Sequence, residues 1–115
     1  HPPDWVFAPV WTLLYALIAV AGWRVWRKAG WRGARKPLTL YAAQLVLNLG
    51  WSIIFFGLQN VGLAFAEILV LLALIVATAR AFRSIDRIAA LLFVPYAIWV
   101  TFAAVLNGAI LFLNG

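Results

Sequence analysis

The chain has 115 residues, of which 67% are hydrophobic and 10% are charged, and its formal net charge is +6. A soluble domain carries about 25% charged residues, so this chain has too little polar surface to cover a globule in water. A soluble enzyme, a nucleic-acid-binding domain and a disordered tail are therefore poor fits. The composition favours a small multi-pass membrane protein that forms a single domain over residues 1–115.

Cysteine and methionine are both absent from the chain. The lack of cysteine excludes disulfides, thiol catalysis and thiolate metal sites. Residues 1–4 do not resemble a signal peptide. Because there is also no initiating methionine, we expect that a segment N-terminal to His1 is missing.

Long uncharged stretches predict four transmembrane helices. A helix needs about 20 mainly apolar residues to cross a hydrocarbon core of about 30 Å. The uncharged stretch over residues 37–66 contains Gly57, Gln59, Asn60 and Gly62, which are a turn signal that divides it. The fold class expected is all-α, an integral membrane helical bundle. The predicted helices cover residues 8–26, 38–56, 62–82 and 88–113.

The basic residues fall in two segments, residues 24–36 and 80–87. With four membrane crossings these two segments share one side of the membrane, and the positive-inside rule predicts that this side is cytoplasmic. A basic run can also bind nucleic acid, but a solvated loop that sets the topology is the better reading, so no nucleic-acid partner is expected. Contact with anionic membrane lipid is compatible with either reading.

Few side chains are suited to acid–base or metal chemistry. The one histidine is His1, and Glu67 is the one acid within a predicted helix. A Ser/His/Asp triad, a paired-carboxylate site and a zinc site are therefore not expected. Three readings of Glu67 stay open: a place at the membrane interface, a hydrogen bond between helices, and a proton or ion relay.

Polar and aromatic residues recur at spacings of three and four, which puts them on one face of each of three predicted helices. Such faces point toward protein or a cavity, because lipid offers no hydrogen-bond partners. We predict a shared pocket for a large, planar, mostly apolar ligand; the alternative is that these residues serve packing between helices. The residues are Trp11 and Tyr15 in 8–26; Tyr41, Gln44, Asn48, Trp51, Ser52 and Phe55 in 38–56; and Pro95, Trp99, Ala103, Leu106 and Asn107 in 88–113.

The predicted helix over residues 62–82 carries small residues at spacings of four and seven, namely Gly62, Ala66, Ala73 and Ala77. Small residues at such spacings allow two helices to approach closely. A homodimer interface and a contact within one chain are equally compatible with this pattern.

Three segments together resemble the TspO/MBR family of tryptophan-rich sensory proteins and translocator proteins. They are PPDWVFAPVWTLLY at 2–15, YAAQLVLNLGWSIIFFG at 41–57 and VPYAIWVTFAAVLN at 94–107. The family has five transmembrane helices, so the resemblance implies that the four predicted here are its second to fifth and that the first is lacking. It also implies a bacterial cell membrane and ligands such as porphyrins, sterols, and isoquinoline or benzodiazepine drugs. The family's sterol motif is not matched, because no Tyr or Arg follows Leu106 and Asn107.

The resemblance also implies a ligand site. Trp11 and Trp99 match tryptophans implicated in porphyrin photochemistry. No obligatory cofactor and no metal are implied, and protoporphyrin IX or a related tetrapyrrole is the expected ligand. The ligand-binding residues carried over from the family are Trp11, Tyr15, Asn48, Trp51, Phe55, Trp99 and Ala103.

Three functions follow as hypotheses. The first is a membrane receptor or sensor for tetrapyrroles and related hydrophobic ligands. The second is an enzyme-like, light-dependent degradation of bound porphyrin, in which the ligand supplies the photochemistry. The third is a small multidrug-type transporter that uses Glu67 as its proton-coupled group.

Overall fold

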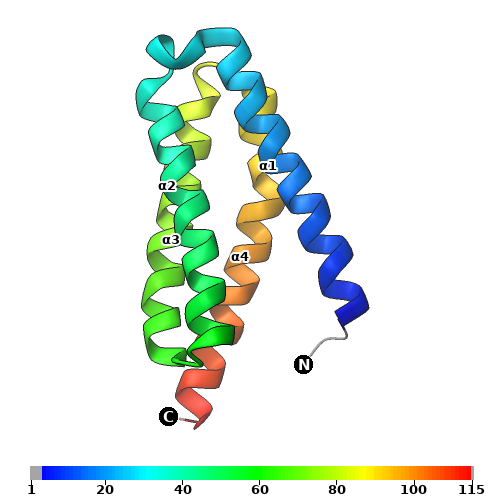
Figure 1. Ribbon diagram of the computed structural model, residues 1–115, viewed down its shortest axis with the longest axis vertical. Coiled ribbons are helices and arrows are strands. Elements are labelled where there is room, and N and C mark those ends of the chain that lie inside the picture. Colours follow the sequence, from blue (N-terminus) through cyan, green and yellow to red (C-terminus); the bar gives the residue numbers. More distant parts are fainter. Residues whose placement is uncertain (1–3, 115) are drawn as a thin grey trace.

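The structure, a computed structural model, describes the backbone of residues 4–114 and the side chains of residues 9–113. The beginning of the first family-like segment, residues 2–8, therefore lies outside the described side chains. The described residues form helices α1 (Asp4–Gly33), α2 (Arg35–Ser52), α3 (Val61–Arg83) and α4 (Arg87–Asn114), and a π-helical turn η1 (Ile53–Gly57) that follows α2 (Figure 1). The predicted all-α class is confirmed.

Four helices in this part of the chain are long and apolar enough to cross a membrane. They agree with the four predicted helices, but the first two extend further into the basic segment. α1 continues to Gly33 instead of ending at residue 26, and α2 begins at Arg35 instead of residue 38. Charge was the wrong marker for these ends because Arg and Lys are good helix formers once their side chains reach water.

The path of the chain changes direction at Gly30. Its φ of 67° and ψ of 176° interrupt α1, a conformation that glycine adopts without the steric penalty of a Cβ. The residues after it cross the end of the bundle before α2 begins (Figure 1). Pro37 is tolerated near the start of α2 because an N–H in the first turn has no partner within the helix.

The turn predicted between the second and third helices is present, with a feature that the sequence analysis missed. After Ser52 the backbone of α2 widens into the π-helical turn η1, which ends at Gly57. Leu58 N then donates to Ile53 O at 3.0 Å. Gln59 has a φ of 54°, and Asn60 caps α3 by accepting a hydrogen bond from Leu63 N at 3.0 Å. This polar capping residue explains why α3 begins at Val61.

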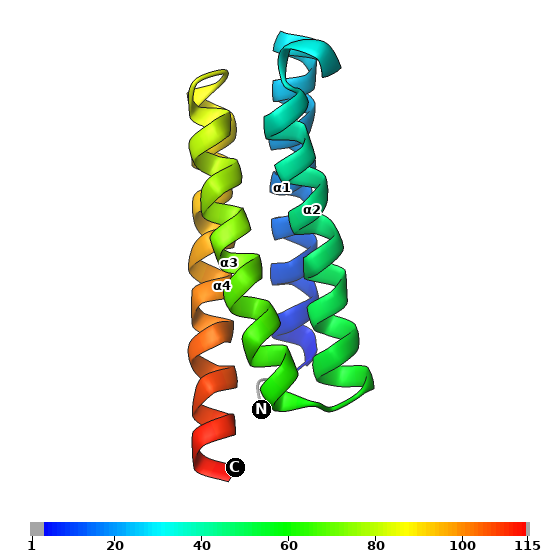
Figure 2. The same cartoon turned by 90° about the vertical axis from the view of Figure 1, so that its left-hand side faces the viewer.

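Neighbouring helices are antiparallel (Figures 1 and 2). The most extensive contact is between α3 and α4, followed by α2 with α3 and α1 with α4, whereas α1 and α2 contact each other less. α1 inclines away from α2 toward its N-terminal end (Figure 1). Large apolar side chains fill the centre, while most other apolar residues stay exposed, as they do in a protein that is solvated by lipid. The fully buried large residues include Ile18, Ile68, Leu71, Ile75, Phe82, Phe93 and Tyr96.

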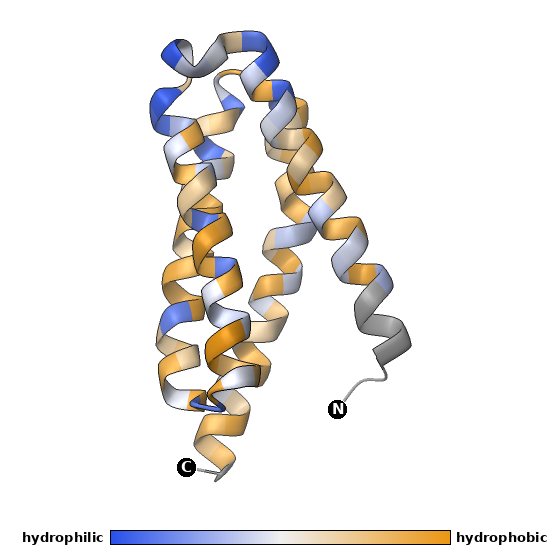
Figure 3. Ribbon diagram, in the orientation of Figure 1, coloured by the Kyte–Doolittle hydropathy of each residue, from blue (hydrophilic) through white to orange (hydrophobic). Residues whose placement is uncertain are grey.

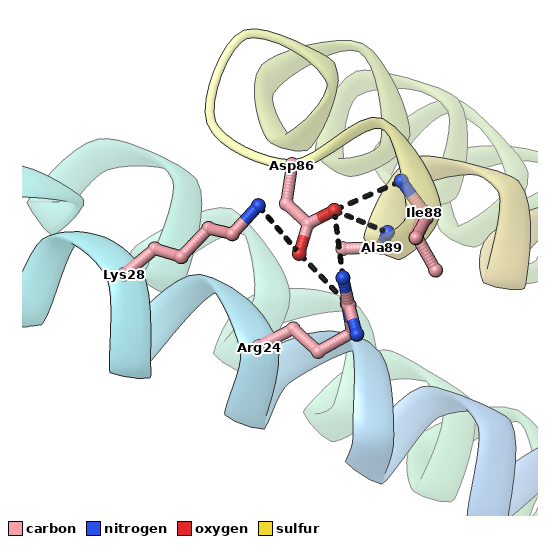
Figure 4. Close-up of polar contacts among 5 residues, drawn as sticks. All are labelled: Arg24, Lys28, Asp86, Ile88 and Ala89. Atoms are coloured by element: carbon pink, nitrogen blue, oxygen red, sulfur yellow. Dashed lines mark hydrogen bonds and ion pairs between the residues drawn. The ribbon is translucent and has the colours of Figure 1, made fainter.

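Hydrophilic residues gather at the end where α1 connects to α2 and α3 connects to α4 (Figure 3). We call this the basic end, because residues 24–36 and 80–87 lie there. Arg24 Nε contacts Asp86 Oδ2 at 2.7 Å and Lys28 Nζ contacts the same oxygen at 3.4 Å (Figure 4). Asp86 Oδ1 also accepts hydrogen bonds from the N–H groups of Ile88 and Ala89, so it caps α4.

The same contacts set the charge state of Asp86, which is buried between α1 and α4. The hydrogen bond from Arg24 lowers the pKa of Asp86 to about 2, assisted by the backbone N–H groups of Ile88 and Ala89 and opposed by burial. A carboxylate is therefore kept at the joint between α1 and the α3–α4 loop.

Candidate functional site

The polar face predicted for the second helix points into the bundle. Gln44, Asn48 and Trp51 are the buried residues of α2. Two of them carry carboxamides, which are costly to bury unless they are hydrogen-bonded. Their partners therefore identify the helices that this face contacts.

Asn48 and Tyr96 are the centre of a hydrogen-bonded group that joins three helices. Tyr15 OH donates to Asn48 Oδ1 at 2.5 Å, and Asn48 Nδ2 donates to Tyr96 OH at 2.9 Å. Tyr96 OH in turn donates to Gln44 Oε1 at 2.7 Å. We call Tyr15, Gln44, Asn48 and Tyr96 the polar network. It connects α1, α2 and α4 at the level of the bilayer core.

Aromatic rings lie beside Tyr15, the most exposed member of the polar network. The ring centroids of Trp11 and Trp99 are 6.3 Å apart with an interplanar angle of 88°, an edge-to-face contact between α1 and α4. Trp11 also lies 5.6 Å from Tyr15, and Trp99 lies 5.7 Å from Phe102. Trp11 and Trp99 are half-buried, and Tyr15 is 44% exposed. These rings therefore keep accessible faces beside a polar group.

Trp51 forms a second centre, nearer the η1 turn. Its ring is buried and stacks on Phe55 with centroids 5.0 Å apart. Its indole N–H donates to Asn107 Oδ1 at 3.1 Å, and Asn107 Nδ2 donates to Val61 O at 3.1 Å. The Trp51 indole is thus fixed by bonds that tie α2 to α4 and α4 to the start of α3.

Six of the seven predicted ligand-binding residues lie on α1, α2 and α4, and Phe55 lies in η1. Trp11, Tyr15, Asn48 and Trp99 form one continuous set of contacts, and Trp51 stacks on Phe55 in a second group. Ala103 is half-buried against the core. The alternative reading, packing between helices, also describes the polar members, since Asn48 and Trp51 bond across helix boundaries. Their binding of a ligand stays a prediction.

Tyr96 is the main residue that the sequence analysis left out of the site. It is fully buried, and its hydroxyl both accepts from Asn48 and donates to Gln44. A signal for it was present: Tyr96, Ala103 and Asn107 are seven and four residues apart, which places them on one face of α4. The predicted face runs through Pro95 and Trp99, one position away from Tyr96, so this pattern puts Tyr96 beside it.

Glu67 lies between α2 and α3. A Cβ placed on Gly50 would lie 2.8 Å from Glu67 Oε2, so the absence of a side chain on Gly50 makes room for the carboxyl group. Glu67 Oε1 is buried and has no hydrogen-bond partner among the described residues. Glu67 is half-buried, and within the described part of the chain its Oε1 makes no hydrogen bond between helices. A place at the membrane interface and a role in a proton or ion relay stay predictions.

The small residues of α3 lie on its outer side. Gly62, Ala66 and Ala73 are exposed, and Ala77 is half-buried. The buried residues of α3 lie on another face, at Ala64, Ile68, Leu71, Ile75, Thr78 and Phe82. The small residues are therefore available for contact with a second molecule or with lipid.

The chemistry of the site is limited to indoles, phenols and carboxamides. Over the part of the chain that the structure describes, no three His, Cys, Asp or Glu side chains come together in a group suited to a metal ion. Such a site can hold a flat guest by ring contacts and a few hydrogen bonds.

Comparison with known proteins gives one consistent result. Residues 1–113 match the family model described as the TspO/MBR family. The chain is 44% identical to a tryptophan-rich protein TspO from Chlorobaculum tepidum, an alignment that covers 99% of this chain and 73% of that protein. It is 42% identical to a tryptophan-rich sensory protein from Cereibacter sphaeroides, which covers 99% and 70%.

An animal protein is equally similar. The chain is 41% identical to the translocator protein of the sheep Ovis aries over 93% of its own length, and it spans 64% of that protein's length. The family-model match and these identities agree with the three segments on which the resemblance was based. With four apolar helices, this chain is a multi-pass membrane protein, and it belongs to the TspO/MBR family.

Proposed function

We propose that this chain is a membrane receptor or sensor that binds flat hydrophobic ligands. Porphyrins, such as protoporphyrin IX and haem-type tetrapyrroles, are the main ligand class; sterols and isoquinoline or benzodiazepine drugs are further ones. Relatives named as translocator and tryptophan-rich sensory proteins support this role.

The observation that carries the proposal is the meeting of Trp11 and Trp99 beside Tyr15. The ring centroid of Trp99 lies 6.3 Å from that of Trp11, and the ring centroid of Tyr15 lies 5.6 Å from it. One ligand with a wide π-surface can therefore contact rings of α1 and α4 together. Accessible ring faces favour stacking. The Tyr15 hydroxyl donates its hydrogen to Asn48, so its oxygen can accept a hydrogen bond from a pyrrole N–H of the ligand.

The test is a titration of the detergent-solubilised protein with protoporphyrin IX, followed by the shift of the main porphyrin absorbance band. Trp11→Ala and Trp99→Ala are expected to weaken binding about 10-fold each, since each removes about 1–3 kcal/mol of ring stacking. Trp31→Ala is the matched control, because it removes an exposed tryptophan at the basic end. If all three variants titrate like the parent, the site is misassigned.

Light-dependent degradation of the bound porphyrin is a second candidate, favoured by the closeness of two oxidisable indoles to each other. The protein with porphyrin is illuminated, and loss of the absorbance band is compared with that of free porphyrin in the same detergent. In a Trp11→Phe, Trp99→Phe double variant, the porphyrin absorbance band is expected to be lost only as fast as that of free porphyrin. This result would support a catalytic role of these two residues. Equal loss with and without protein removes this candidate.

A proton-coupled transporter that uses Glu67 is the alternative function. The unpartnered Oε1 of Glu67 favours it. The position of its carboxyl group beside Gly50 opposes it, because Gly50 is about 200° around α2 from Asn48. Vesicles that contain the Glu67→Gln variant are compared with vesicles that contain the parent. Equal rates of substrate uptake would eliminate this function.

The sidedness of the membrane protein and its self-association complete the proposal. We place the basic end on the cytoplasmic side of a bacterial cell membrane, supported by the positive charge of residues 24–36 and 80–87. Since the chain has no cysteine, Ser84→Cys and Gln59→Cys are expected to react with an impermeant thiol reagent from opposite sides. The exposed small residues of α3 support a homodimer.

A further inference from the structure

A concave site lies at the basic end, separate from the aromatic residues. It is a cavity of about 200 Å³ lined by Arg24, Arg27, Lys28 and Asp86. Arg24 is nine residues beyond Tyr15, which is about 14 Å along a helix. The cavity is therefore near the membrane surface, while the polar network is deeper.

The cavity carries an excess of positive charge. It contains three cations and one carboxylate, and that carboxylate is already occupied by Arg24, Lys28 and the N–H groups of Ile88 and Ala89. The guanidinium of Arg27 lies 5.2 Å from the centroid of the Trp23 ring. This contact orients Arg27 without neutralising it. The site is thus preorganised to receive an anion.

The donors suit a phosphate group. Guanidinium groups bind phosphate oxygens through paired N–H donors, and a lysine ammonium adds a compact charge. A cavity of about 200 Å³ has room for a phosphate with bound water, since one water occupies about 30 Å³. A phosphate can come from a lipid headgroup or from a soluble phosphate, and the surroundings separate these sources.

Exposed apolar residues continue from the cavity toward the middle of the membrane. Val20 and Leu13 are four and eleven residues before Arg24, so they lie below it on the same side of α1, and both are exposed. Leu91 of α4 is also exposed, and Trp23 and Trp26 are exposed at the level of the cations. Tryptophan is typical of the membrane–water interface, so this surface accommodates acyl chains under a headgroup.

We propose that the cavity formed by Arg24, Arg27, Lys28 and Asp86 binds the headgroup phosphate of an anionic membrane lipid. Arg27 and Lys28 supply the charge in excess of the single carboxylate, although Lys28 also contacts Asp86 at 3.4 Å. The Arg24–Asp86 pair holds α1 and α4 at the spacing that shapes the cavity. Basic cavities between transmembrane helices are suited to such headgroups.

The test measures lipid retention by native mass spectrometry of the full chain in neutral detergent, with added phosphatidylglycerol or phosphatidylcholine. The parent is expected to retain phosphatidylglycerol in preference. An Arg27→Gln, Lys28→Gln double variant is expected to lose about 25-fold in affinity for it, because each juxtamembrane cation contributes about fivefold. The matched control, Arg32→Gln with Arg35→Gln, removes the same charge from positions that do not line the cavity and is expected to change affinity less than about threefold, because the attraction of a charge falls off with distance.

Further arms identify the source of the phosphate and control for folding. Inorganic phosphate and glycerol 3-phosphate are added at the same concentration as the lipid, with the thermal unfolding midpoint as the readout. They are expected to leave this midpoint unchanged, whereas phosphatidylglycerol raises it. Lys28→Arg is expected to keep lipid binding, and circular dichroism checks the helix content of each variant. Equal losses in the two double variants, equal retention of both lipids, or equal protection by free phosphate would each overturn the proposal.

Discussion

Tyr96 is the residue on which the polar network depends most, because its single hydroxyl serves Asn48 and Gln44 at once. Tyr96→Phe keeps the ring and leaves two buried carboxamides each without one partner. We expect the free energy of unfolding to fall by about 1–2 kcal/mol, measured by denaturation in mixed micelles. Thr101→Val, which removes an exposed hydroxyl bonded within its own helix, is the control and is expected to have little effect. Equal effects of both would show that the network adds no stability.

Asp86 gives the fold a dependence on pH. Its pKa in the folded protein is about 2, below its usual value of 3.8, so the ionised form favours folding. This contribution is present above about pH 4 and is lost as the pH falls from about 4 to about 2. We expect the thermal unfolding midpoint of the parent to fall more steeply across this window than that of Asp86→Asn. Parallel curves would show that the contacts with Arg24 and α4 do not stabilise the bundle.

At the scale of whole elements, Gly22 sets how closely α1 approaches α2. A Cβ on Gly22 would lie 2.6 Å from the hydroxyl oxygen of Tyr41, and that hydroxyl is held by a hydrogen bond to Ile18 O at 2.9 Å. We expect Gly22→Ala to destabilise the protein by about 1–3 kcal/mol, since the Tyr41 ring also packs against Phe82 and Phe93, with ring centroids 5.7 and 6.2 Å away.

Gly50→Ala is the matched comparison for this prediction. Its Cβ also meets a close atom, Glu67 Oε2 at 2.8 Å, but that atom is the end of a flexible side chain. Alanine is also the better helix former by about 1 kcal/mol. We expect Gly50→Ala to be tolerated in the same unfolding experiment. If it costs as much as Gly22→Ala, the carboxyl group of Glu67 is held rigidly in place.

The elements also show what the sequence could predict. Four helices and the turn after Gly57 followed from uncharged length and turn residues, because the bilayer fixes how long an apolar stretch must be. The helix ends in the basic segment and the η1 turn could not be predicted in this way. Hydropathy reports neither the helix propensity of charged residues nor a widening of the backbone. Spacings of three and four identified the buried side of α2, including Asn48 and Trp51.

The contacts between elements were beyond the sequence. Arg24 and Asp86 are 62 positions apart, and their pairing depends on how α1 inclines against α4. The hydrogen bonds of Tyr96 depend on the same geometry. A lone acid among many basic residues and a tyrosine in register with Asn107 were the available signals, but neither specifies a partner.

The whole molecule measures 46 Å along its longest axis, more than the hydrocarbon thickness of about 30 Å. Its ends therefore reach the headgroup regions, and its middle is covered by lipid or by a second copy. We expect Ala66→Leu with Ala73→Leu to convert a dimer to a monomer without loss of helix content, because larger side chains keep the α3 helices apart. Chemical cross-linking in membranes measures this, and Ala109→Leu on the exposed side of α4 is the control. An unchanged dimer fraction would place the interface elsewhere.

Tyr15 is the half-exposed member of a network whose other members are buried. A guest that displaces its phenol deprives Asn48 Oδ1 of its donor, and a buried acceptor left without one costs about 1–3 kcal/mol. A pure hydrocarbon bears that cost in full, whereas a molecule with its own N–H or O–H at that point restores the bond. The fold thus favours ligands that carry a hydrogen-bond donor on an otherwise apolar surface.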